Sequence, residues 1–206
     1  MSYGALGTTH HSLHDFAALR AVNNLILIAP ADNFETREAV RAAASLDKPV
    51  YLRFGKAPLY TLPNADSEKF EIGKARLLRD GADVAFTATG ETVIHALLAA
   101  THLENESGLS CRVLSFPTIK PLDTDAILQA ARDCRAVITV EEHMVCGGLG
   151  EACAGVLAQA GAACRFKIVG IPDEYTVTGS QADIFRHYGI SMEGLAKAAL
   201  QQIRGN

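Results

Sequence analysis

The sequence contains no tryptophan, and aromatic residues make up only 6% of its 206 positions. Its five cysteines are an odd number, and no two of them have C-x-x-C spacing, which argues against a disulfide framework and a zinc site. No apolar run approaches the roughly 20 residues that span a bilayer, and the N-terminus lacks the basic-then-apolar layout of a signal peptide. We therefore expect a cytoplasmic protein with reduced thiols and no membrane association.

An excess of positive charge is also absent. Lysine and arginine number 19 against 23 aspartates and glutamates, a net charge of −4 that provides no electrostatic footprint for nucleic acid. Repeats and low-complexity tracts are missing as well. Hydrophobic residues make up 49% of the chain, enough to bury the core of one domain, or of one domain plus part of another.

The hydrophobic pattern predicts two groups of alternating strands and helices. In the first group, strands over 25–29 and 50–54 flank a helix that begins at Asp32 or Asn33, an order that implies a parallel pair. The second group has strands and helices in alternation from residue 83 onwards. The sequence thus predicts the α/β class: a three-layer α/β/α domain with a mostly parallel sheet over 71–206, a partial α/β unit over 1–56, and a linker over 57–70.

A glycine turn, Gly147-Gly148-Leu149-Gly150, stands between a predicted strand over 137–140 and a predicted helix. Such a turn can bring backbone N–H groups to the top of a sheet, but its spacing fits neither G-x-G-x-x-G nor the P-loop. We expect the chain to leave the strand in a turn through Glu141, Glu142 and His143. We interpret Cys146 as a buried thiol, the alternative being a nucleophile activated by His143.

The first fifteen residues are rich in glycine, threonine and histidine and show no apolar periodicity, so they predict a loop. A metal site on His10, His14 and Asp15, serving a metal-dependent hydrolase, is one alternative. The interpretation we favour has no metal, and histidines that bond to substrate, solvent or backbone. Further along, Arg53 and Lys56 stand at the end of a predicted parallel strand, where cations can bind an anionic group. The alternative of equal standing is a charge paired with a nearby carboxylate.

Three segments, taken in order, carry a family resemblance. The first comprises Gly7-Thr8-Thr9-His10 with Asp15, Leu19-Arg20-Ala21-Val22, Asn24-Leu25 and Ala29-Pro30-Ala31-Asp32. The second is Pro49-Val50-Tyr51-Leu52-Arg53. The third comprises Val140-Glu141-Glu142-His143, Gly147-Gly148-Leu149-Gly150 and Gly170-Ile171-Pro172-Asp173. In order and spacing they resemble the C-terminal part of the transketolase family of thiamine-diphosphate-dependent enzymes: the end of the pyrimidine-binding domain followed by the C-terminal domain.

The resemblance implies roles for individual residues. His10 matches the family's substrate-channel histidine and becomes the catalytic candidate, although His11 stands where the family has glutamine. Arg53 matches an arginine that binds the acceptor's phosphate, a task that suits a permanently charged, bidentate guanidinium. His11, Asp15, Glu142 and His143 become candidates for contact with substrate or a subunit interface.

The resemblance also implies a reaction, the transfer of a two-carbon ketol unit between sugar phosphates, with thiamine diphosphate and Mg²⁺ in the complete enzyme. The family's G-D-G…N motif and its activating glutamate have no counterpart here, so we expect this chain alone to bind neither cofactor and to be inactive. The expected partners are a second copy in a homodimer, an N-terminal thiamine-diphosphate-binding domain or subunit, and a sugar phosphate. The alternative is a non-catalytic dimerisation or assembly module.

The unit over 16–54 is only part of a sheet, so its inward faces need partners. We therefore expect the chain to be a truncated gene product or one piece of a protein encoded in pieces. We also expect it to self-associate or to have a mobile N-terminal third.

Overall fold

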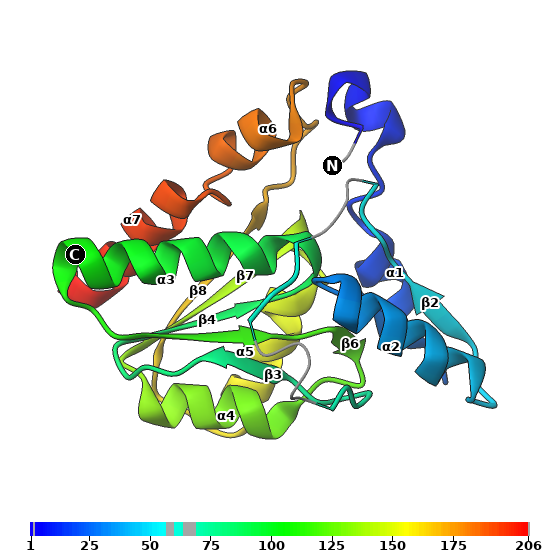
Figure 1. Cartoon of the computed structure of the whole chain (residues 1–206), viewed down its shortest axis with the longest axis horizontal. Helices are drawn as coiled ribbons and strands as arrows, with labels where there is room; N and C mark the ends of the chain where they lie inside the picture. Colours follow the sequence, from blue (N-terminus) through cyan, green and yellow to red (C-terminus); the bar gives the residue numbers. More distant parts are fainter. Residues whose placement is uncertain (2, 57–59, 64–68, 206) are drawn as a thin grey trace.

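The computed structural model describes residues 1, 3–56, 60–63 and 69–205, so the predicted linker over 57–70 lies partly outside the described residues. Its first part contains short elements that lie together to one side of the molecule (Figure 1). In chain order these are the 3₁₀ helix η1 (Gly4–His10), α1 (Asp15–Arg20), β1 (Ile26–Ile28), α2 (Asn33–Ala44) and β2 (Val50–Leu52).

A small sheet of three strands, in the order β2-β1-β6, joins the first part of the chain to the second. β1 and β2 pair in parallel through Ile26↔Val50 and Ile28↔Leu52, which confirms the predicted β-α-β unit. The third strand, β6 (Thr118–Lys120), runs antiparallel to β1. The hydrophobic pattern did not predict β6, whose three residues pair with a strand distant in sequence.

The larger sheet has five strands in the order β3-β5-β4-β7-β8. Four of them pair in parallel and β3 runs antiparallel at the edge, which confirms the predicted mostly parallel sheet. The short edge strand β3 was not predicted. The strands are β3 (Arg76–Arg79), β4 (Val84–Ala88), β5 (Cys111–Ser115), β7 (Ala136–Met144) and β8 (Arg165–Ile171).

Helices cover both faces of the larger sheet and make the predicted three layers (Figure 1). One face carries α3 (Val93–Ser107) and α7 (Met192–Arg204), with η2 (Gly90–Thr92) leading into α3 and α6 (Gln181–His187) preceding α7. The other face carries α4 (Thr124–Asp133) and α5 (Leu149–Gln159).

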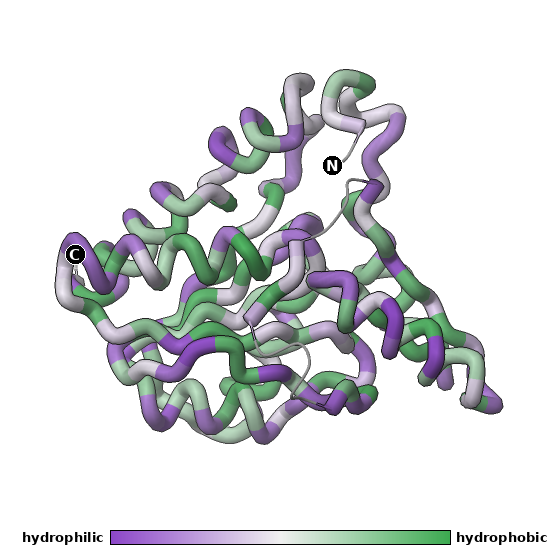
Figure 2. The backbone as a smooth tube through the Cα atoms, viewed as in Figure 1, coloured by the Kyte–Doolittle hydropathy of each residue, from purple (hydrophilic) through white to green (hydrophobic). Residues whose placement is uncertain are grey.

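The alternation of side chains along β4 divides the core in two. Val84 and Phe86 pack toward α3, whereas Ala85 packs toward α4 and α5. The central strands are accordingly hydrophobic along most of their length (Figure 2). None of the described helices combines the length and hydrophobicity needed to cross a bilayer.

Side-chain caps fix the starts of α2 and α4. Asp32 accepts a hydrogen bond from the Glu35 amide at the start of α2, and Asp123 accepts one from the Ala126 amide at the start of α4. Both aspartates satisfy N–H groups that a helix leaves without internal partners.

Candidate functional site

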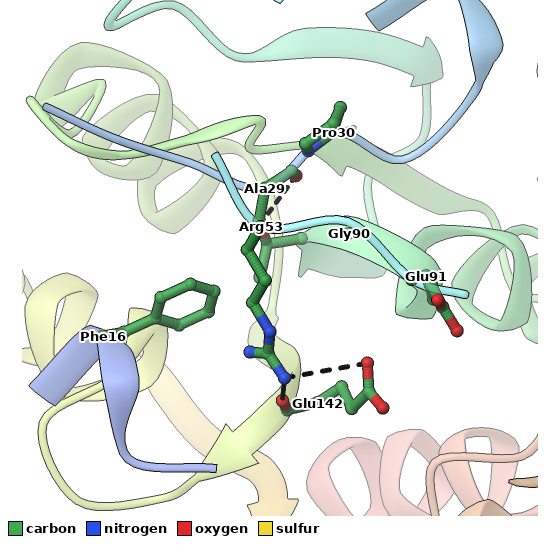
Figure 3. A pocket seen from close by; sticks show the side chains of 9 residues that line it. Phe16, Ala29, Pro30, Arg53, Gly90, Glu91 and Glu142 are labelled. Carbon is green, nitrogen blue, oxygen red and sulfur yellow. Dashed lines mark hydrogen bonds and ion pairs between the residues drawn. The ribbon is translucent and has the colours of Figure 1, made fainter. Parts of the chain in front are cut away.

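A pocket lies where the carboxyl ends of strands from both sheets meet (Figure 3). Ala29 follows β1, Arg53 follows β2, Thr89 follows β4, and Glu142 belongs to β7. Ligands of open α/β sheets bind at such ends. We call this the junction pocket, and its lining residues are Phe16, Ala29, Pro30, Arg53, Gly55, Thr89, Gly90, Glu91 and Glu142.

Arg53 crosses the junction pocket toward β7 (Figure 3). Its Nη2 donates to the backbone oxygen of Glu142 at 2.7 Å and lies 3.8 Å from Glu142 Oε2. Its Nε lies 3.5 Å from Asp15 Oδ2, and the guanidinium carbon lies 4.7 Å from the centre of the Phe16 ring. The guanidinium is thus engaged by carboxylates, as one of the two sequence alternatives expected, and phosphate binding by Arg53 stays a prediction.

Asp15, the first residue of α1, is buried beside this arginine. Its Oδ2 accepts a hydrogen bond from the Tyr51 hydroxyl at 2.8 Å, and its Oδ1 lies 3.9 Å from His143 Nε2. Burial, and secondly the Asp15 carboxylate, raise the pKa of Tyr51 to about 12, so the phenol keeps its proton. The structure therefore brings together four candidates from the sequence, namely Asp15, Arg53, Glu142 and His143.

His10 and His11 do not line the junction pocket. His10 ends the exposed helix η1, with Nδ1 2.9 Å from the Thr9 hydroxyl, so the prediction of a loop over the first fifteen residues was wrong for Gly4–His10. His11 Nδ1 lies 3.1 Å from the Thr176 hydroxyl, and burial lowers the pKa of His11. Over the described residues, no group of three or more histidines, cysteines or acidic side chains is gathered to hold a metal, His10, His14 and Asp15 included.

Glu141, Glu142 and His143 belong to strand β7 and not to the turn that their polarity suggested. His143 is fully buried: its Nδ1 donates to the Met144 oxygen at 2.6 Å, and its Nε2 accepts the Ala17 amide at 3.3 Å. The Phe16 ring stacks on the imidazole with centroids 5.0 Å apart. Burial lowers the pKa of His143 to about 4, so the ring is neutral at pH 7 and Nε2 is free to accept.

The side chain of Glu141 reaches from β7 to the N-terminus of α5. Its fully buried carboxylate accepts the Leu149 amide at 2.7 Å and the Gly150 amide at 2.9 Å. Burial raises the pKa of Glu141 to about 7, and these two amide bonds oppose the rise. The glycine turn is therefore not an open anion site, because the chain's own carboxylate already fills it.

The same glycine turn receives helix α1. Arg20 Nη1 donates to the Gly147 and Gly148 oxygens at 2.5 and 3.0 Å. A side chain at Gly147 would meet Ala17 Cβ at 2.4 Å, so only glycine permits this approach. The turn thus serves as a docking surface for α1. Cys146, at its edge, is exposed, and its interpretation as a buried thiol was wrong.

Comparison with known proteins agrees with this architecture. The family description "Transketolase, C-terminal domain" matches residues 73–195, more than half of the chain. The chain belongs to the transketolase family. A second description, "Transketolase, pyrimidine binding domain", matches residues 1–61.

Similarity to individual members of the transketolase family runs along nearly the whole chain. A protein of Phocaeicola vulgatus, named as one subunit of an apulose-4-phosphate transketolase, is 43% identical over 204 residues, which are 99% of this chain and 64% of that protein. A 1-deoxy-D-xylulose-5-phosphate synthase of Thermomicrobium roseum is 38% identical over 199 residues, 96% of this chain and 32% of that protein. A structure described as a split gene transketolase, inactive beta4 tetramer, superposes with TM-score 0.87 at 34% identity, covering 96% of this chain and 64% of that one.

Phe16, Tyr51 and Glu91 are among the residues of the site that the sequence did not single out. Tyr51 and Arg53 are two positions apart around the end of one strand, so a side-by-side placement could have been expected. Glu91 lies three residues after the end of β4, so its place at the carboxyl edge of the sheet could have been expected. Phe16 gave no signal beyond that of a core residue.

Proposed function

We propose that this chain is the C-terminal section of a split transketolase-family enzyme that transfers a two-carbon ketol unit between sugar phosphates. It would act in the cytoplasm only together with an N-terminal section that holds thiamine diphosphate and Mg²⁺. The observation that carries this proposal is the 43% identity over 99% of the chain to a protein named as a transketolase subunit. This chain spans 64% of that relative's length.

The matches to residues 1–61 and 73–195 support a division into a partial pyrimidine-binding unit (1–56), a linker (57–70) and a C-terminal domain (71–206). In this proposal His10 contacts the sugar near the reacting carbon and Arg53 binds the acceptor's phosphate. His11, Asp15, Glu142 and His143 would orient these groups or line a subunit interface.

The described residues do not fit the diphosphate end of thiamine diphosphate. The glycine turn at α5 is closed by Glu141, and a group of side chains suited to Mg²⁺ is absent from the described part of the chain. The proposal therefore assigns the diphosphate and the metal to the partner section.

This assignment is tested by titrating the purified chain with thiamine diphosphate plus Mg²⁺ in a calorimeter. The expected result is no saturable heat for the chain alone. Addition of an N-terminal section, to be sought in a neighbouring gene, should yield micromolar binding and ketol transfer. Saturable micromolar binding by the chain alone would mean that it carries a complete cofactor site, and the proposal would fall.

Arg53 can be tested in the reconstituted enzyme. We expect Arg53→Leu to raise the KM for the phosphorylated acceptor about tenfold, equivalent to about 1.4 kcal/mol of lost binding, with a smaller change in kcat. Arg53→Lys should recover part of the loss, because it keeps the charge but not the bidentate geometry. Arg37→Leu, on the exposed side of α2, is the control. An unchanged KM for Arg53→Leu would mean that Arg53 does not bind the acceptor's phosphate and only pairs with Asp15 and Glu142.

A second candidate, an assembly module, is favoured by the relative described as an inactive beta4 tetramer. For this chain it takes the form of self-association, as a homodimer or a larger oligomer, in the absence of the N-terminal section. The half-exposed edge strand β2 and the exposed Phe54 beside it offer apolar surface for such contacts.

A further inference from the structure

A cluster of charged and polar side chains is buried behind the junction pocket and has no part in the proposed chemistry. Arg76 is 4% exposed, and Asp32, Glu35 and Ser115 are fully buried. We call these four residues the buried ionic cluster. Charges with so little solvent contact are rare unless they are paired and hydrogen-bonded.

The buried ionic cluster connects α2 to the edge of the larger sheet. Glu35 Oε1 accepts hydrogen bonds from Arg76 Nη1 and Ser115 Oγ, both at 2.7 Å. Arg76 Nη1 also lies 3.8 Å from Asp32 Oδ2, and its guanidinium lies 4.9 Å from the Phe34 ring centre. Arg76 and Ser115 are paired positions on β3 and β5, so the two donors to Glu35 are held side by side by the sheet.

Glu35 extends these contacts to the wall of the junction pocket. Its second oxygen, Oε2, accepts the Ala31 amide at 2.7 Å, and its own amide donates to Asp32 Oδ1 at 2.7 Å. The turn over 29–32 is thereby fixed to the carboxylate. Ala29 and Pro30, the first residues of this turn, line the pocket. Arg76 therefore reaches the turn through hydrogen bonds to and from Glu35, and also through its ion pair with Asp32, the last residue of the turn.

A buried ion pair is a poor source of stability, because desolvation offsets most of the attraction between its charges, and apolar residues of equal volume often serve as well. An ion cluster instead fixes the relative position of the elements that it joins, because its hydrogen bonds form in only one arrangement. The contacts of Glu35 run to the pocket turn on one side and to the larger sheet on the other. The cluster therefore sets the position of one with respect to the other.

We propose that Arg76 is a positioning residue for the junction pocket: through Glu35 it holds the turn over 29–32 against the larger sheet. The inference rests on the proposed function in one respect, namely that the junction pocket is the functional site. Its test needs neither catalysis nor the partner section, so its failure is distinguishable from failure of the proposed function.

The test is hydrogen exchange of the full chain carrying Arg76→Met, read by mass spectrometry and by the amide NMR signals of Ala31 and Glu35. Exchange over 26–35 should accelerate about tenfold or more, and the Ala31 amide signal should shift as its acceptor moves. Amides of β4 and β7 should change less than threefold. Arg79→Met is the matched control, because Arg79 lies on the same strand but pairs with Glu104 at the surface.

Two more variants keep the test decisive if Arg76→Met folds poorly. Ser115→Ala removes one hydrogen bond from Glu35 and keeps the ion pair, and it should accelerate the same amides by about threefold. Arg76→Lys keeps the charge and should restore the Ala31 signal most of the way to its original position. Equal acceleration in all strands would mean that Arg76 only stabilises the fold, and unchanged exchange over 26–35 would mean that the turn is held by other contacts. Either result would overturn the inference.

Discussion

Gly148→Ala is expected to lower the free energy of unfolding by about 3 kcal/mol, although it adds only one methyl group. The added Cβ would lie 1.9 Å from Glu141 Oε2 and 2.7 Å from His143 Nδ1. Neither group can move aside freely, because Glu141 is held by the amides at the start of α5 and His143 by Met144 and Ala17. Either α5 must shift, or the Glu141 carboxylate must leave two buried amides without an acceptor. Urea unfolding followed by circular dichroism measures the loss.

The same helix supplies the control. Gly155 lies within α5, and a Cβ built there meets no atom within 4 Å. Gly155→Ala should therefore raise the free energy of unfolding by up to about 1 kcal/mol, since alanine favours the helix over glycine. Two glycine-to-alanine changes in one element thus have opposite expected signs. If Gly148→Ala left the free energy of unfolding nearly unchanged or raised it, the Glu141 carboxylate would not need the close approach of the Gly148 backbone.

Much of the fold follows from patterns that are local in sequence. The parallel pair β1 and β2, the capped helices α2 and α4, and the alternation of strands with helices are all encoded within short windows. The strands β3 and β6 escaped prediction because both are short and neither has the length or hydrophobicity of a core strand. β3 forms a strand because it pairs with β5, and β6 because it pairs with β1, and neither pairing can be seen in the local sequence.

Several residues of the candidate site could be predicted from the sequence, but the contacts between them could not. Four of the six sequence candidates converge, but Glu141–His143 read as a turn because charged residues in a strand are unfavourable when considered alone. They are tolerated in β7 because the Ala17 amide donates to His143, the Leu149 amide donates to Glu141, and Arg53 pairs with Glu142. Ala17 and Arg53 are distant in sequence, whereas Leu149 begins the helix that follows β7 directly. Arg76 and Glu35 escaped notice for the same reason, since burial of a charge depends on partners that local sequence does not reveal.

Glu141 and His143 have pKa values displaced in opposite directions, which predicts a specific dependence of stability on pH. The pKa of His143 falls from 6.5 to about 4, so its contribution to stability is complete above pH 6.5 and is lost as the pH falls through 4. The pKa of Glu141 rises from 4.5 to about 7, so its contribution is complete below pH 4.5 and is lost as the pH rises through 7. In the wild-type chain the two slopes oppose each other between about pH 4.5 and 6.5.

Single substitutions should reveal each slope, because the difference from the wild type isolates the group that was removed. The free energy of unfolding of Glu141→Gln, minus that of the wild type, should rise by about 3 kcal/mol from pH 4.5 to 7, since only the wild type loses the Glu141 contribution there. For His143→Gln the same difference should fall by about 3 kcal/mol from pH 4 to 6.5, since only the wild type gains the His143 contribution. Urea unfolding at half-unit steps from pH 4 to 8 measures both. Parallel profiles for the three proteins would contradict the prediction, and would mean that the carboxyl group and the imidazole titrate in the fold as they do in the unfolded chain.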